Sequence, residues 1–109
     1  MSTAYRIALD AMSGDHGLSA VVPAALAALK DFDDIYLILV GDEQQVREAL
    51  KQYGEAGESE RLQIRHASEV VAMDELPAAA LKKKKDSSMR VAINLVQAGE
   101  ADAVVSAGN

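Results

Sequence analysis

The stretch from Ile35 to Val40 reads IYLILV and is continuously apolar, and Gly41 and Asp42 end it. Short apolar runs of this kind are typical of strands that are buried on both faces of a parallel sheet. Apolar residues recur at helical spacing on both sides of this run, from Val22 to Leu29 and from Val46 to Tyr53. The order helix, strand, helix around a doubly buried strand predicts an α/β fold.

Three further segments are predicted to be strands. Tyr5 to Ala11 is mostly apolar with Asp10 near its end, and Ala103 to Ser106 precedes a polar loop. Leu62 and Ile64 alternate with polar neighbours, so their strand is predicted to have one wetter face. The whole order is strand, helix, strand, helix, strand, irregular segment with helix, strand. This alternation predicts a largely parallel sheet.

Proline, glycine and capping residues predict the helix boundaries. Proline is tolerated in or near the first turn of a helix, so Pro23 predicts that the first helix begins near Ala20. The last helix is predicted to begin around Asp86 or Ser87 and to end at a Gly99 cap. Its predicted buried stripe consists of Met89, Ala92, Ile93 and Val96.

The composition limits the class of protein. With 109 residues, 50% of them hydrophobic, the chain is long enough for one small domain with an aliphatic core. The formal net charge of −6 argues against a nucleic-acid-binding domain, which usually has a basic excess. There is no cysteine for a disulfide or a thiolate metal site, and no apolar run approaches the roughly 20 residues that span a bilayer. Because no signal peptide is visible, we expect a cytoplasmic protein.

A glycine-bearing polar loop follows the first predicted strand. Open α/β sheets bind ligands beyond the carboxyl ends of their strands, so this loop is a candidate wall of a site. Gly14 and Gly17 allow close backbone approach, and the next helix presents N–H groups that favour phosphate. Asp15 and His16 could orient a ligand or carry a proton. The spacing is not the dinucleotide-binding fingerprint, and the alternative is an ordinary polar turn.

A second loop of this kind follows the last predicted strand. The side chains of Ser106 and Asn109 and the amides around Gly108 could contact phosphate oxygens. The two loops would then form two walls of one site. Since the chain ends within the second loop, we expect it to be a piece of a larger protein.

Lysines from Lys82 to Lys85 interrupt an otherwise acidic chain just before the last predicted helix, and a short helix is expected after Pro77. Asp86 or Ser87 can cap the last helix. Cations beside a helix N-terminus are unfavourable, because the positive end of the helix dipole lies there. A nearby anion would relieve this repulsion, so the lysines could receive phosphate or an acidic protein partner. The alternative is a solvated charged turn.

Two other kinds of site are not supported by the sequence. His66 and Glu69 lack the company of further metal-ligating residues, so no metal site is predicted. Ser13, Ser87 and Ser88 have no visible base partner, so a serine nucleophile cannot be argued.

These segments together resemble the N-terminal part of the PlsX family, the phosphate acyltransferases of bacterial phospholipid synthesis. The resemblance covers essentially the whole chain, in order and with matching spacing. It is carried by Ile7 to Gly17 (IALDAMSGDHG), Val22 to Leu29 (VPAALAAL), Val40 to Glu43 (VGDE), His66 to Pro77 (HASEVVAMDELP), Lys84 to Val96 (KKDSSMRVAINLV) and Ala101 to Asn109 (ADAVVSAGN).

The resemblance implies an enzyme that converts acyl-[acyl carrier protein] and inorganic phosphate into acyl-phosphate and free carrier protein. It implies a Rossmann-like three-layer α/β/α fold with a largely parallel sheet, incomplete here, with residues 1–109 as the N-terminal part of a single acyltransferase domain. It also implies a homodimer and a cytoplasmic location peripheral to the inner membrane face, through regions outside this chain. No redox cofactor is implied.

The chain departs from the family pattern at a few positions. The family commonly has glycine in place of Ser13 and proline in place of Leu18, and its last motif continues from Asn109 into Thr-Gly. Family members are much longer, so we expect the 109-residue chain alone to be an inactive fragment. The alternatives are a non-catalytic phosphate- or nucleotide-binding α/β module and a purely structural fragment.

The candidate substrate- and phosphate-binding residues come from both loops, the strand ends before them, the lysine run and the start of the last helix. They are Asp10, Gly14, Asp15, His16, Lys84, Lys85, Ser87, Ser88, Arg90, Ser106, Gly108 and Asn109. No catalytic role is assigned to any one of them.

Overall fold

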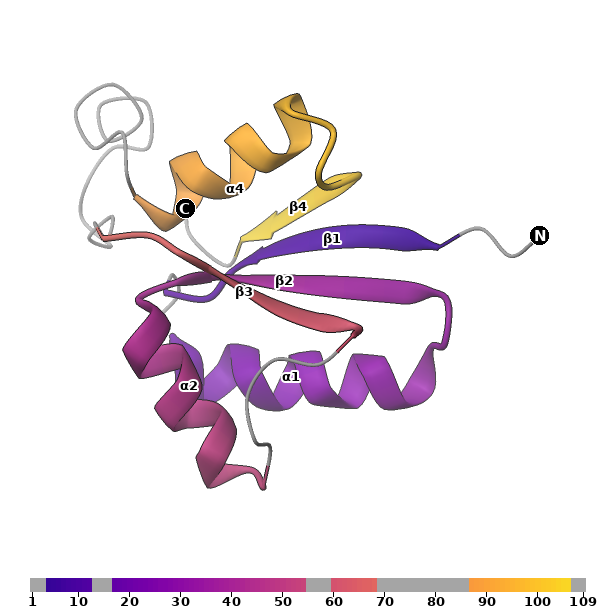
Figure 1. Cartoon of the computed structure of the whole chain (residues 1–109). Helices are drawn as coiled ribbons and strands as arrows, with labels where there is room; N and C mark the ends of the chain where they lie inside the picture. Colours follow the sequence, from indigo (N-terminus) through magenta and orange to yellow (C-terminus); the bar gives the residue numbers. More distant parts are fainter. Residues whose placement is uncertain (1–3, 13–16, 55–59, 69–86, 107–109) are drawn as a thin grey trace.

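The computed structural model describes residues 4–12, 17–54, 60–68 and 87–106. Its four parallel strands form one open sheet in the order β3-β2-β1-β4 (Figure 1). The strands are β1 (Tyr5–Asp10), β2 (Ile35–Gly41), β3 (Leu62–His66) and β4 (Ala103–Ser106), and the helices are α1 (Leu18–Asp31), α2 (Glu43–Gln52) and α4 (Ser88–Gln97). The predicted α/β fold with a parallel sheet is confirmed.

Helices cover both faces of the sheet, α1 and α2 on one side and α4 on the other (Figure 1). Since successive residues of a strand point to opposite faces, each face has its own core. The core under α1 and α2 contains Ala11, Val22, Ala25, Leu37, Leu39, Val46, Leu50, Leu62 and Ile64. The core under α4 contains Ala8, Ile38, Val40, Ala67, Ala92, Leu95 and Ala101.

Strand β2 lies between β1 and β3 and carries the predicted doubly buried run. Leu39 is fully buried in the core under α1 and α2, and its neighbour Val40 is fully buried in the core under α4. The first two residues of the strand, Ile35 and Tyr36, are half-buried. The double burial is therefore confirmed for the second part of the run.

Helix α1 begins at Leu18, so the predicted start near Ala20 is wrong. Gly17 precedes the helix with φ of 49°, in the left-handed region that glycine adopts readily. Its carbonyl accepts the N–H groups of Ala20 and Val21 at 3.1 and 3.0 Å. Pro23 consequently lies beyond the first turn, because the glycine turn, and not the proline, determines where the helix begins.

Helix α4 begins and ends where the sequence predicts. Ser87 is its N-cap, and the Ser87 Oγ accepts the N–H of Arg90 at 3.1 Å. Gly99 follows the helix with φ of 78°, which is the left-handed conformation expected after a helix C-terminus.

The buried face of α4 differs from the predicted stripe. Ala92 is buried as predicted, but the second large contribution to the core comes from Leu95. Met89 and Ile93 are half-buried outside this core, while Val96 packs against it. Apolar residues occupy most positions of this helix, so the position of the sheet selects the face, and the spacing alone does not.

The carboxylate of Asp102, the residue before β4, binds to Arg6 of β1. Asp102 Oδ2 accepts the backbone N–H of Arg6 at 2.9 Å, and its Oδ1 lies 3.5 Å from the Arg6 guanidinium. The backbone hydrogen bond, followed by the side-chain contact, lowers the pKa of Asp102 below its ordinary value. The folded protein therefore favours the charged form of this side chain.

We expect Asp102→Asn to remove a pH-dependent part of the stability. A carboxyl group with a lowered pKa in the folded state stabilises the protein above its unfolded value of 3.8, and this stabilisation is lost as the pH falls through the folded value. The difference in the free energy of unfolding between the two proteins should thus be largest near neutral pH and shrink in acid. Urea unfolding at a series of pH values measures it, and a difference that stays constant with pH would contradict the expectation.

Candidate functional site

The order of the sheet reverses at β1. Strand β2 pairs with β1 on one side after the crossover through α1, and β4 pairs with β1 on the other side after α4, on the opposite face. In open α/β sheets, ligands bind beyond the carboxyl ends of the strands at such a switch point. The β1–β4 ladder ends with Asp10 paired directly to Ser106. The topology thus places these two predicted residues at the switch point.

The carboxylate of Asp10 joins three parts of the chain. Its Oδ1 accepts the hydroxyl of Ser88 at 2.5 Å and the backbone N–H of Met12 at 3.2 Å. Its Oδ2 accepts the hydroxyl of Ser106 at 3.1 Å. The side chain of Asp10 is only 2% exposed, so these donors replace the water that a carboxylate would otherwise bind. Asp10 therefore links the end of β1 with the start of α4 and the end of β4.

The start of α4 lies at the same edge of the sheet (Figure 1). The first N–H groups of a helix carry a partial positive charge and have no partner within the helix, which favours anions nearby. Ser87 satisfies one of them as the N-cap and is fully buried. Arg90, in the first turn, is half-buried, and its Nε lies 3.4 Å from the Asn94 side-chain oxygen. Arg90 thus belongs to the first turn of α4, and its side chain contacts Asn94 one turn further along the helix.

The two serines that bind Asp10 differ in their access to solvent. Ser88 is 2% exposed and is held inside the protein, whereas Ser106 is exposed. A serine hydroxyl has one hydrogen and two lone pairs, so a serine that donates to Asp10 meets any further group as an acceptor. Within the described ranges, every buried side-chain nitrogen and oxygen has a hydrogen-bond partner. The network is thus a satisfied structural unit, and Ser106 is its exposed member.

The carboxyl end of β3 contacts the start of α2. His66 Nδ1 accepts the N–H of Glu43 at 3.1 Å, and the carboxylate of Asp42 accepts the N–H of Gln45 at 3.0 Å. Both side chains act as acceptors for the first turn of α2. His66 therefore has a structural partner, and no group of three or more metal-ligating side chains occurs in the described part of the chain.

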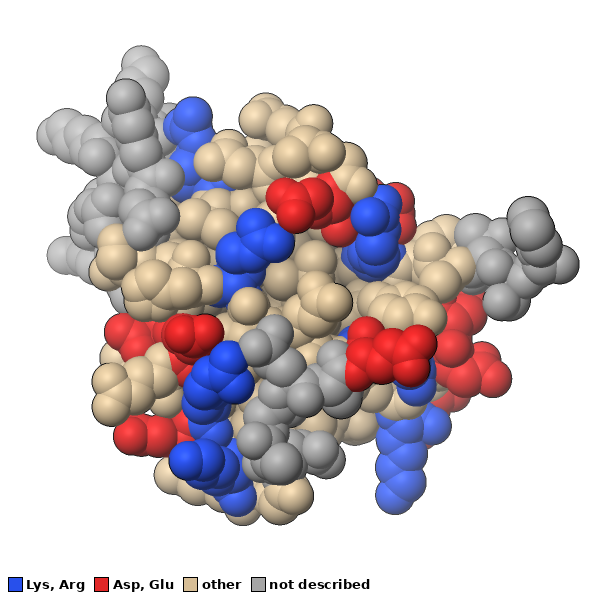
Figure 2. Space-filling view, viewed as in Figure 1, with Lys and Arg blue, Asp and Glu red and all other residues tan. Residues whose placement is uncertain are grey.

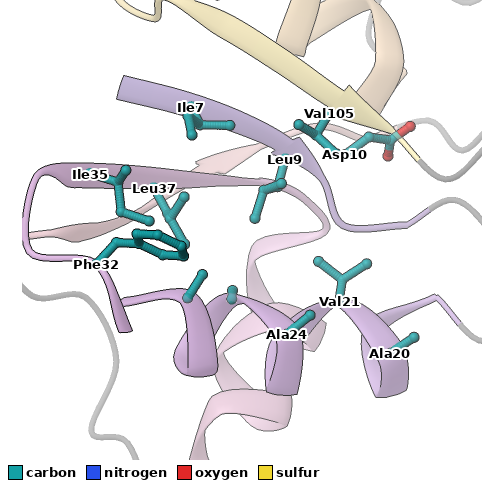
Figure 3. A pocket seen from close by; sticks show the side chains of 12 residues that line it. Ile7, Leu9, Asp10, Ala20, Val21, Ala24, Phe32, Ile35, Leu37 and Val105 are labelled. Carbon is teal, nitrogen blue, oxygen red and sulfur yellow. The ribbon is translucent and has the colours of Figure 1, made fainter. Parts of the chain in front are cut away.

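An apolar groove of about 530 Å³ lies on the α1 side of the sheet (Figure 3). It runs from Phe32 and Ile35 at one end toward Val105 and Asp10 at the other. Ile7, Leu9, Leu37 and the alanines of α1 form its walls. Apart from Asp10 the lining offers no charged group, so this groove is not suited to hold phosphate.

Charged side chains are mixed on the face of the molecule shown in Figure 2. Arg65 pairs with Glu100 at 3.2 Å, and Arg6 pairs with Asp102 at 3.5 Å, in both cases with exposed side chains. Exposed pairs of this kind contribute little to stability.

None of the helices that the structure describes is long and apolar enough to cross a membrane.

Comparison with known proteins identifies the family. Residues 5–109 match the family described as fatty acid synthesis protein. The chain belongs to this family. It is 58% identical over 109 residues to a phosphate acyltransferase of Halorhodospira halophila, and 60% identical over 109 residues to one of Alkalilimnicola ehrlichii. A phosphate acyltransferase of Francisella philomiragia is 52% identical over 110 residues.

The match covers the chain far more fully than it covers these relatives. It includes 100% of this chain and 32% of the first two relatives, and 96% of this chain and 32% of the third. The chain therefore spans about a third of the length of these members of the fatty acid synthesis protein family. A site in such a segment can be one part of a larger site.

The structure brings together some of the predicted site residues. Asp10, Ser88 and Ser106 are joined by hydrogen bonds, and Ser87 and Arg90 lie on the same helix start. The other predicted site residues lie outside the described ranges: Gly14, Asp15, His16, Lys84, Lys85, Gly108 and Asn109. The helix predicted after Pro77 also lies outside them.

The sequence predicts Asp10, Ser88 and Ser106 each as a site residue but does not connect them into one network. The sequence does contain a signal for this network. A serine at a strand end and a serine at a helix start both lie at the carboxyl edge of a parallel sheet, so they can meet there. The carboxylate that accepts both hydroxyls ends the neighbouring strand. The Met12 N–H, which also donates to Asp10, carries no sequence signal at all.

Proposed function

We propose that a protein carrying this segment is a phosphate acyltransferase that moves an acyl group from acyl carrier protein to inorganic phosphate. In support, three relatives named phosphate acyltransferase are 52–60% identical to the chain. The description of the family, fatty acid synthesis protein, agrees with an acyl donor. The identity of the donor as acyl carrier protein rests on the resemblance to PlsX.

The reaction places two demands on the site. A phosphate oxygen attacks the thioester carbonyl carbon, the carbonyl oxygen becomes negatively charged, and the C–S bond then breaks to release the carrier thiol and acyl-phosphate. The site must therefore hold an anionic nucleophile and stabilise a developing oxyanion with fixed donors. Fixed donors need support from surrounding residues.

The Asp10 network is the observation that carries the proposal. It fixes the start of α4 and the end of β4 relative to β1, at the edge where α/β sheets bind ligands. We assign phosphate to the α4 start, where N–H groups and Arg90 offer positive charge. Gly14, Asp15, His16, Lys84, Lys85, Gly108 and Asn109 remain predicted contributors to the same site.

The remaining parts of the proposal also rest on the resemblance to PlsX. They are a homodimer, a cytoplasmic enzyme peripheral to the inner membrane face, and an isolated 109-residue segment without activity. The share of the relatives that the segment covers, 32%, supports the last of these, since most of the catalytic domain would lie elsewhere.

Arg90→Ala, made in a full-length phosphate acyltransferase that carries this segment, is expected to raise the KM for phosphate about tenfold. A hydrogen bond to a charged group contributes about 1.5–3 kcal/mol, and the planar fork of arginine can bind two phosphate oxygens together. Arg90→Lys should restore only part of the affinity. Release of the carrier thiol and trapping of acyl-phosphate with hydroxylamine measure the rate.

The matched control is Arg47→Ala on α2, whose guanidinium pairs with Glu43 at 3.2 Å on the surface. It should leave the KM for phosphate unchanged. Phosphate binding without any thiol release would favour the alternative, a non-catalytic phosphate-binding module. An equal increase of the KM for phosphate in both arginine variants would contradict the assignment of Arg90 to the phosphate site.

A further inference from the structure

On the α1 side of the sheet, strands β1 and β4 are less well covered than β2. Leu37 and Leu39 of β2 are buried on this side, whereas Ile7 and Leu9 of β1, which is also an interior strand, are only half-buried. On the edge strand β4, Val105 is 52% exposed. The apolar groove of about 530 Å³ lies between α1 and these two strands (Figure 3).

The incompletely covered part of the opposite face has a different character. There Arg6, Tyr36, Gln63 and Arg65 line a depression of about 250 Å³, and these polar side chains are suited to contact with water. The groove beside α1 is apolar apart from Asp10 at its end. An apolar surface of this kind, open to solvent within one segment of a longer protein, marks a contact with another element.

The wall that α1 contributes is shaped for a second helix. Ala20, Ala24 and Ala28 line the groove at a spacing of four residues, so they form one ridge of α1. Ala20 and Ala24 are exposed, and their short side chains allow a neighbouring helix to approach closely. A helix is about 10 Å wide and strands lie about 4.8 Å apart, so one helix beside α1 has the width to cover both β1 and β4.

The full-length relatives contain enough further chain to supply such a helix. The matched segment makes up 32% of each of the first two relatives, so about two thirds of each of these proteins lies outside it. A helix in the same chain is present at a high effective concentration, which favours it over a second copy or a separate protein. Helices are also the elements that cover the faces of largely parallel sheets.

We propose that an amphipathic helix from the part of the full-length protein outside this segment packs into the groove. Its large aliphatic side chains fill the space between the alanine ridge of α1 and the exposed face of β1 and β4. The two exposed apolar side chains at the ends of the groove, Phe32 and Val105, become buried by the same contact. This inference goes beyond the proposed function, since it holds whether or not the protein transfers acyl groups.

The first test is thiol labelling of a full-length phosphate acyltransferase that carries this segment and whose own cysteines have been replaced. The segment itself contains no cysteine. We expect the thiol of Ala24→Cys to react about 100-fold or more slowly than that of Ala27→Cys, because a covered thiol reacts only after a local opening. Ala27 is the matched control, since it is exposed on the same helix and does not line the groove.

Val105→Cys provides a second position at the other end of the groove. It replaces valine by a smaller side chain, so it leaves room for the helix even if a cysteine at position 24 does not. Its thiol should be protected to a similar extent. Equal labelling rates of Ala27→Cys and the two groove variants would overturn the inference.

A disulfide scan identifies the element that covers the groove. Ala24→Cys is combined with single cysteines placed one at a time along the helices outside the segment, and mild oxidation links pairs whose Cα atoms come within about 4.4–6.8 Å. We expect links to positions three or four residues apart on one helix, with the mass of a single chain on non-reducing gels. Links that join two chains, or the lack of any link within one chain, would overturn the inference.

The remaining outcomes concern a ligand and the proposed function. Protection of the groove thiols that develops only when acylated carrier protein is added would mean that the acyl chain occupies the groove, and it would overturn the inference. Protected thiols and links within one chain, in a protein without acyl transfer, would support the inference and contradict the proposed function. Acyl transfer with unprotected groove thiols would do the reverse.

Discussion

Leu39→Ala is expected to lower the free energy of unfolding of this chain by about 2–5 kcal/mol. Leu39 is fully buried in the central strand, between Leu9 of β1 and Ile64 of β3 in the ladder. Val22, Val46 and Leu50, from the helices above it, belong to the same core. Few neighbours can move into the space left by the missing methyl groups, so the cavity term adds to the lost hydrophobic transfer.

The matched control is Leu26→Ala, which deletes the same atoms from a half-buried position of α1. It should cost clearly less, since part of that side chain is already in water. Urea unfolding of the two variants and the wild-type chain measures both effects. Equal losses at the two positions would show that the centre of the sheet can relax, in conflict with the double burial of β2.

Local signals in the sequence predict much of this fold. The run from Ile35 to Val40 predicts the central strand, because only a strand covered on both faces has no polar side. Ser87 and Gly99 predict both ends of α4, because capping is a local interaction within a few residues. The alternation around Leu62 and Ile64 predicts the half-exposed edge strand β3.

Features that depend on distant neighbours could not be predicted in this way. The buried face of α4 is ambiguous in the sequence, and contact with the sheet selects Leu95 where the spacing favoured Met89 and Ile93. Arg61 precedes the edge strand, yet its guanidinium donates to the carbonyls of Leu29, Phe32 and Ile35 around the end of α1. Such contacts arise only when the chain has folded.

In the candidate site, too, the residues can be predicted from local signals, whereas their contacts depend on the fold. Residue type and position at strand ends or helix starts are sufficient to name Asp10, Ser88 and Ser106. Their assembly into one network depends on the sheet order, because β4 must pair with β1 and α4 must cross the opposite face. The segments Lys82–Lys85 and Ser106–Asn109 were predicted by the same reasoning, but the lysines and residues 107–109 lie outside the described ranges. Their roles therefore remain predictions.

A double-mutant cycle on Asp10 and Ser88 is expected to show a coupling energy of about 1–3 kcal/mol. Asp10→Ala leaves the hydroxyl of Ser88, which is 2% exposed, without its acceptor at 2.5 Å. Ser88→Ala leaves a buried carboxylate with one donor fewer. Each single change thus lowers the stability by the cost of an unsatisfied buried group. The double variant removes both groups together and avoids this cost. Its loss of stability should be smaller than the sum of the two single losses.

The cycle on Asp10 and Ser106 provides the internal control, because it uses the same carboxylate. Ser106 is exposed and donates at 3.1 Å, so water can replace either partner when the other is removed. Its coupling energy should be clearly smaller than that of Asp10 and Ser88. Urea unfolding of the variants of both cycles decides the point. Equal coupling energies, or additivity in the Asp10–Ser88 cycle, would mean that the buried hydroxyl does not hold the start of α4 to β1, and the geometry assigned to the phosphate site would lose its support.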